Sequence, residues 1–325
     1  MDGSPVWVEL LGGPVVVVEV MGTTPTPLSF DHIDADDLRR FETYRNYLQR
    51  FCSLSRSEHP TWLTLAQACV AGTQALQPVG SLDASWVRRF MGIAWNTECL
   101  LNSVPEGADL LRVHNAWLPV QAYYTVYAAA EALSYVIDGE KADGHTKALR
   151  KATAFLVKGP LAPWNLAYRG AKGSSGKQHR QMNFPPDLKP EHNLAGAGAS
   201  DIGVIATCLK AEHQNRIKED YKGSGKRQYE YDPGVTGLLH FLYRLRIRSN
   251  YRGIDVFLVN AGADAHRSFR ESLLCVVRRT LTYFEVVLLR KCRRSTLTEM
   301  ADAFVGRNRL AEQLKNRFVA YKKLY

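Results

Sequence analysis

The chain lacks the sequence features that would place it in or across a membrane. Its 325 residues contain no run near the roughly 18 to 20 apolar residues that a spanning helix needs. The first 20 residues carry Asp2 and Glu9 where a signal peptide has basic residues, and a Gly-Gly-Pro segment at 12–14 interrupts their apolar stretch. We therefore expect no membrane association and a cytoplasmic location.

The chain also lacks cysteines spaced as a metal-binding or redox pair. We expect the cysteines to be small, unpaired, buried side chains of a protein in a reducing compartment, and we expect no metal site. The six are Cys52, Cys69, Cys99, Cys208, Cys275 and Cys292. The segment 171–178 is similar to a phosphate-binding loop, but no Ser or Thr follows Lys177 and no strand precedes it. We expect a surface loop there, no ATP site and no cofactor.

The positive charge is concentrated in the last quarter of the chain. The net charge is +10, yet residues 240–325 hold 18 Lys and Arg against 7 Asp and Glu, and the rest holds 24 against 25. Such asymmetry favours an anionic partner such as RNA, and the guanidinium groups of segments 278–279 and 290–294 suit phosphate. The alternative is a solvated basic helical surface without a partner.

Hydrophobic periodicity predicts a mainly α protein, folded as one large domain or two modest ones. Two β-branched runs around Gly-Gly-Pro predict a small β-hairpin at 6–20. Long irregular stretches at 164–201 and 222–227 lie in a predicted insertion at about 160–230. Apolar residues recur at helical spacing in segments starting at 34, 61–76, 83–101, 121–137, 146–157, 201–220, 234–251, 264–291 and 296–322.

The most specific polar cluster lies near the end of the helix predicted at 234–251. Arg246 and Asn250 are four residues apart and would share a helical face, with Tyr251 just beyond. Arg244 and Arg248 would share a neighbouring face. A guanidinium, an amide and a phenol could thus converge at one helix end.

Two stretches resemble the HEPN superfamily of helical-bundle, RNA-associated domains. Ala122-Tyr123-Tyr124 opens an Ala-rich helix that is followed by Gly144-His145, similar to the first long helix of the family and the His that opens the next one. Leu245-Arg246-Ile247-Arg248-Ser249-Asn250-Tyr251 is similar to the signature of the family. The resemblance covers about 115–292 and implies an HEPN-like bundle with a long insertion.

The resemblance implies metal-independent RNA cleavage in a homodimer. In catalytic members an Arg and a His activate the ribose 2′-OH and stabilise the phosphorane, but here Tyr251 stands where that His would fall. A phenol with a pKa near 10 is a poor base at neutral pH unless nearby arginines favour the phenolate. We predict catalytic roles for Arg246, Asn250 and Tyr251. We predict nucleic-acid contacts for Arg244, Arg248, Arg278, Arg279, Arg290, Lys291, Arg293 and Arg294.

These patterns divide the chain into three parts. Residues 1–110 form a hairpin and helical region, 111–295 the HEPN-like domain, and 296–325 a C-terminal basic amphipathic helix.

Plainer interpretations stand beside the functional ones. An equally weighted interpretation gives Arg246 a structural role, in an ion pair with Glu131, the acid in the apolar helix. His145 fits the start of a helix better than a catalytic base. Two further groups have structural interpretations: solvent-facing side chains at His179, His192 and His213, and core side chains at Tyr123, Tyr124 and Tyr127.

Three functions follow, in order of preference. The first is an HEPN-like, RNA-directed endoribonuclease of a toxin or phage-defence system. The second is a non-catalytic HEPN-like adaptor or dimer scaffold that binds nucleic acid or a nucleotide. The third is a subunit whose basic face docks an acidic protein, such as an antitoxin.

Overall fold

The computed structural model describes most of the chain and confirms the mainly α class. Eleven α-helices, one π-helical turn and three short strands occur in its described residues. The predicted hairpin at 6–20 and the basic loop at 222–227 lie outside them. The described residues are 34–73, 83–102, 107–142, 144–170, 179–188, 190–191, 199–220, 233–292 and 294–324.

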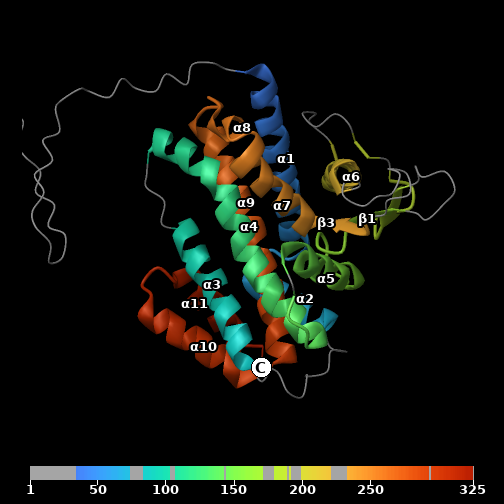
Figure 1. Ribbon diagram of the computed structural model, residues 1–325. Coiled ribbons are helices and arrows are strands. Elements are labelled where there is room, and N and C mark those ends of the chain that lie inside the picture. The colour runs from blue at the N-terminus through green and yellow to red at the C-terminus, as the bar shows by residue number, and fades with distance from the viewer. Residues whose placement is uncertain are drawn as a thin grey trace, which may run out of the picture.

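Two long helices, α4 (Ala108–Asp138) and α9 (Ala263–Lys291), pack together through the centre of the molecule (Figure 1). Both bury side chains on several faces, as expected for helices with apolar residues all round. Helix α4 ends at Gly139, whose φ of 76° lets its N–H donate to the Tyr135 carbonyl at 2.8 Å. These two helices form the frame on which the candidate sites are built.

The N-terminal helices pack on this frame. Helices α1 (Ala35–Glu58) and α2 (Trp62–Gly72) contact α9, and α3 (Ala84–Asn102) contacts α4. None of the helices in the described part of the chain combines the length and apolarity that crossing a membrane requires.

The irregular stretch predicted at 164–201 contains two short strands, β1 (Ala167–Gly170) and β2 (His179–Met182). Together with β3 (Val235–Gly237) they form an antiparallel sheet in the order β2-β1-β3. The sheet lies beside α5 (His145–Lys158) and α6 (Asp201–Asp220) (Figure 1). Strands of three or four residues are too short for a clear period-two pattern, so the sequence did not predict them.

The helix predicted at 234–251 consists of three different segments. Strand β3 leads into α7 (Leu238–Ile247), which continues as a π-helical turn, η3 (Arg248–Arg252). A short helix, α8 (Asp255–Leu258), follows. The change from α to π geometry falls within the predicted signature.

The C-terminal segment folds as two helices, α10 (Arg294–Arg307) and α11 (Glu312–Lys322), where the sequence predicted one. The chain turns between them, and the Leu310 N–H donates to the Asn308 side chain at 3.0 Å. Side chains from all three predicted parts belong to one hydrophobic core. The C-terminal segment is therefore packed against the rest of the molecule.

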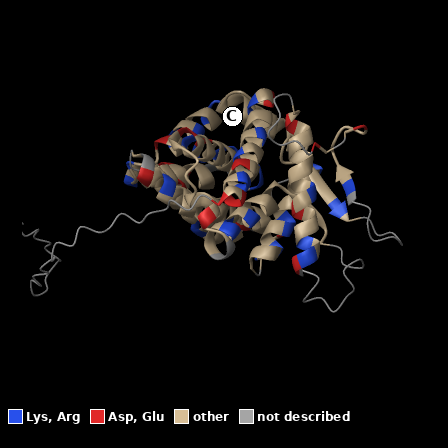
Figure 2. Ribbon diagram, turned by 90° about the horizontal axis from the view of Figure 1, so that it is seen from above, with Lys and Arg blue, Asp and Glu red and all other residues tan. Residues whose placement is uncertain are grey.

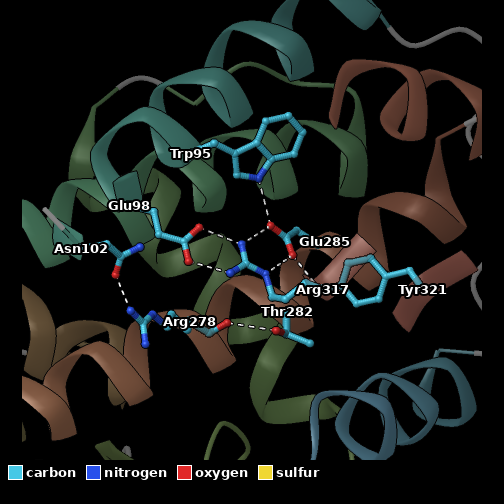
Figure 3. A network of polar contacts seen from close by, with 8 residues as sticks. All are labelled: Trp95, Glu98, Asn102, Arg278, Thr282, Glu285, Arg317 and Tyr321. Carbon is cyan, nitrogen blue, oxygen red and sulfur yellow. Dashed lines mark hydrogen bonds and ion pairs between the residues drawn. The ribbon is translucent and has the colours of Figure 1, made fainter. Parts of the chain in front are cut away.

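A buried ion network fixes α11 to this core (Figure 3). Arg317 is fully buried and donates to Glu98 of α3 at 2.6 and 2.8 Å. It also donates to both carboxylate oxygens of Glu285 on α9 at 2.9 Å. Trp95 and Tyr321 donate to Glu285 as well, at 2.9 and 2.6 Å, so both acids are fully engaged.

The cysteines differ in part from the prediction. Cys52 of α1 and Cys275 of α9 form a disulfide, with Cα atoms 6.0 Å apart, so the expectation of unpaired side chains is wrong for this pair. Their sequence separation of 223 residues gave no indication of the pairing. Cys69, Cys99 and Cys208 are free and buried, as predicted.

Candidate nucleic-acid site around Arg246

Arg246 lies in a cluster of tyrosines between α7 and α4. Buried Leu242 and Leu245 hold α7 in place, and the half-buried Arg246 points its Nη2 to the Tyr124 hydroxyl at 3.0 Å. Its Cζ lies 5.5 Å from the ring centroid of Tyr124 and 5.9 Å from that of Tyr243. Such contacts between a cation and aromatic faces hold the guanidinium at a fixed place.

His145 contacts the same tyrosines from the start of α5. Its Nδ1 lies 2.8 Å from the Tyr123 hydroxyl, and its ring stacks on Tyr127 at a centroid distance of 4.0 Å. Arg246 lies 5.9 Å from the Tyr123 ring, on which His145 also packs at 5.7 Å. His145 therefore opens a helix, as predicted, and belongs to the Arg246 cluster at the same time.

Glu131 also belongs to this cluster, through its contact with Tyr127. Its Oε1 accepts a short hydrogen bond from the Tyr127 hydroxyl, and its side chain is buried. Tyr123 is fully buried, as predicted, whereas Tyr124 and Tyr127 are partly exposed. The hydroxyl of Tyr124 accepts a hydrogen bond from Arg246, and the hydroxyl of Tyr127 donates one to Glu131.

Burial shifts the protonation equilibria of this cluster. It lowers the pKa of His145, and the positive charge of Arg246 lowers it further. It raises the pKa of Glu131 and that of Tyr127, whose hydroxyl binds this carboxyl. Burial and the charge of Arg246 both favour the neutral form of His145, the form in which an imidazole can accept a proton.

The other two predicted catalytic residues lie in η3. Asn250 is half-buried, and Tyr251 follows it in the backbone, with its side chain outside the described set. Arg246 lies in α7 and Asn250 in η3, so the four-residue spacing between them spans the change from α to π geometry. Single π-helical turns inside helices are frequent at functional sites.

Arg244 does not lie on the surface that was predicted for it. It is buried and donates to Glu212 at 2.9 Å and to Glu219 at 2.7 Å. Both acids belong to α6, so this guanidinium links α7 to α6 instead of facing a phosphate. Arg248, at the start of η3, is half-buried.

Arg279 is also buried, and its guanidinium binds its own chain. It donates to the Ser55 hydroxyl at 2.6 Å, to the Ser55 carbonyl at 2.9 Å and to the His59 carbonyl. The neighbouring Arg278 is half-buried and binds the Asn102 side chain. Of this predicted pair, Arg279 is therefore buried and Arg278 is partly exposed.

The remaining predicted basic residues lie elsewhere. Arg290 and Lys291 are half-buried in the last turn of α9, about 18 Å along the helix from Arg278 by a rise of about 1.5 Å per residue. The side chains of Arg293 and Arg294 lie outside the described set. Figure 2 shows basic and acidic segments distributed over many elements of the described chain.

The prediction for His213 can also be compared with the structure. His213 was expected to face solvent, but it is fully buried in α6, with Nδ1 2.9 Å from the Thr236 hydroxyl. Among the described residues no group of three or more His, Cys, Asp or Glu side chains could hold a metal ion.

Sequence reasoning assigned His145 and the tyrosines to structural roles and did not predict their convergence on Arg246. Their positions in α4, α5 and α7 are brought together only by tertiary packing. Comparison with known proteins gives no further indication, because the chain matches no protein-family model, curated protein or solved structure.

Proposed function

We propose that this chain is an HEPN-like, RNA-directed protein that cleaves RNA without a metal ion, as a toxin or phage-defence effector. The observation that carries the proposal is the convergence of Arg246 and His145 on the same tyrosines, Tyr123 and Tyr124. In this arrangement the Arg246 guanidinium could bind a phosphate, and the His145 imidazole could accept a proton. The resemblance at 245–251 supports the same assignment.

In this proposal His145 is the base, whereas in the family signature the base falls at the position of Tyr251, for which the sequence predicted a catalytic role. The imidazole removes the proton of a ribose 2′-OH, whose oxygen attacks the adjacent phosphorus. Arg246 stabilises the charge of the phosphorane, and Asn250 and Tyr251 of η3 hold the backbone on either side. The bond to the 5′ oxygen breaks, this oxygen takes a proton from water, and the products carry a 2′,3′-cyclic phosphate and a 5′-hydroxyl.

Cleavage of single-stranded RNA in the presence of EDTA tests the proposal. We expect wild-type protein to cleave, and His145→Gln and Arg246→Gln each to lower kcat/KM by about 100-fold, the usual loss for a base or a charge-stabilising donor. Arg150→Gln is the matched control, because Arg150 is exposed on the same helix as His145. Activity that survives in both cluster variants would exclude this site.

A second candidate is a non-catalytic adaptor that binds RNA at the same cluster. It is favoured by the contacts of Arg246, which already donates to Tyr124 and lies against aromatic rings. RNA that is bound by the wild-type protein in a salt-sensitive manner, and is not cleaved at any protein concentration, would select this candidate over the first.

The proposal includes a cytoplasmic homodimer, and an exposed apolar stripe supports the dimer. Leu110, Val113 and Trp117 share one face of α4 and are 53%, 48% and 53% exposed. Leu100, in the last turn of α3, is 58% exposed. Apolar side chains grouped in this way are typical of protein interfaces.

A further inference from the structure

A second basic feature lies away from the Arg246 cluster, in a pocket between α1, α2, α9 and the turn from α10 to α11. The pocket has a volume of about 930 Å³ and shares no lining residue with that cluster. This volume falls within the roughly 300 to 1,000 Å³ of small-molecule sites. Its walls carry five arginines, namely Arg56, Arg270, Arg278, Arg279 and Arg309.

Acidic side chains do not balance this charge. Glu271 and Glu312 are the two acids of the lining, and both are exposed. The Glu312 carboxylate already lies 3.8 Å from the Lys315 ammonium, which faces it from the same helix. The pocket therefore has a positive potential, which a concave wall of low dielectric strengthens.

Three of the arginines are partly or fully buried and bind neutral groups. Arg270 donates to the Leu101 carbonyl at 3.4 Å, Arg278 to the Asn102 amide oxygen, and Arg279 to backbone and hydroxyl oxygens. Burial lowers the pKa of all three guanidinium groups, and that of Arg279 falls to about 10. Burying a positive charge is costly, and an anion in the pocket would offset part of that cost.

Several donors of the pocket wall have no partner within the described protein. The Nε atoms of Arg270 and Arg278 and the amide nitrogen of Asn102 are buried and make no hydrogen bond. An ion or a water molecule bound beside such a donor is one way in which a folded protein satisfies it. Figure 3 shows Asn102 and Arg278 together at the edge of the Arg317 network.

The start of α2 adds a further element that favours anions. Pro60, Thr61 and Trp62 line the pocket where this 11-residue helix begins. The positive end of the helix dipole adds to the field of the arginines. The Arg279 guanidinium also lies 5.6 Å from the Trp62 ring, which fixes this wall.

We propose that this pocket binds a small molecule through a pyrophosphate group. Arg270, Arg278 and Arg309 provide the charge-assisted donors, and the start of α2 faces the same anion. A concave site enclosed by four elements fits a small ligand better than the extended backbone of RNA. The proposal does not depend on the function proposed for the Arg246 cluster, because binding here requires none of its residues.

Calorimetry of the full-length protein with inorganic pyrophosphate, ADP and adenosine tests the proposal. We expect pyrophosphate and ADP to bind and adenosine not to bind. Arg309→Gln should weaken binding by at least about 10-fold, because a charge-assisted hydrogen bond is lost. Arg309 is exposed, so this change leaves the core intact. Tighter binding of ADP than of pyrophosphate would identify a nucleotide as the source of the group.

The control is Arg267→Gln, an exposed arginine of α9 that pairs with Asp264 outside the pocket. The Arg267→Gln variant should bind pyrophosphate and ADP with the same affinity as the wild-type protein. Failure of the wild-type protein to bind pyrophosphate and ADP, or equal losses in Arg309→Gln and Arg267→Gln, would overturn the proposal. The proposal would also be overturned if a short RNA bound in a way that depends on Arg309 and pyrophosphate did not compete with it. That result would identify the pocket as part of an RNA-binding surface.

Discussion

At the scale of single residues, Arg317 shows how much of the fold depends on one side chain near the end of the chain. Its guanidinium satisfies two buried carboxylates from two other helices. Arg317→Met keeps most of the side-chain volume but leaves Glu98 and Glu285 without their cation. We expect the free energy of unfolding to fall by about 3 to 5 kcal/mol, as for other broken buried ion pairs, in chemical denaturation.

Lys315→Met is the matched control, because Lys315 lies on the same helix in an exposed pair with Glu312. Its effect should stay within about 0.5 kcal/mol. Adding Glu98→Gln and Glu285→Gln to Arg317→Met should restore part of the lost stability, since the uncompensated charges are removed. A loss in Arg317→Met no larger than that in the control would show that the network is dispensable.

Residue types alone could not predict these sites. The sequence located the excess of arginine correctly, but Arg244 and Arg279 proved to be buried in structural contacts. Whether an arginine faces solvent or the core depends on the elements packed on its helix. The same holds for His145, because its neighbours Tyr123 and Arg246 come from other helices.

At the scale of elements, the apolar stripe on α4 provides a test of the proposed dimer. Trp117→Glu places a charge at the largest side chain of the stripe, so we expect the dissociation constant of the dimer to rise at least about 10-fold. Sedimentation velocity measures the change. Val319→Glu, at a similarly exposed site on α11, should leave the assembly unchanged. A wild-type protein that stays monomeric at high concentration would contradict the dimer.

The elements themselves were predicted to different degrees. Long helices such as α6 and α9 fall close to their predicted limits, because their apolar periodicity extends over many turns. Strand β3 and the turn between α10 and α11 were not predicted. Both depend on contacts, with β1 and with the core, that local patterns do not contain.

At the scale of the whole molecule, buried and half-buried histidines link stability to pH. Burial lowers the pKa of five of them: His59, His114, His145, His240 and His266. Below a pH of about 6.5 the unfolded chain takes up protons that the folded chain does not, so stability falls on acidification. The raised pKa values of Glu131 and Glu212 act in the opposite direction, but these acids are fewer.

His240 makes this prediction specific, because burial and the charge of Arg216 hold its pKa well below the ordinary value. We expect His240→Asn to reduce the slope of unfolding free energy against pH, between about pH 6.5 and 5, by up to about 1.4 kcal/mol per unit. Chemical denaturation across this range measures it. Higher salt should leave the wild-type slope unchanged, since burial is the main cause. An equal slope in wild type and variant would refute the assignment.

The central position of α9 has a consequence for how the chain is made. This helix covers the apolar faces of α1, α2 and α4, yet it lies in the last fifth of the sequence. A chain growing from its N-terminus therefore holds these faces uncovered until α9 has been synthesised. A protein cut short before residue 263 would keep them exposed, and self-association or capture by chaperones is the expected fate of such a fragment.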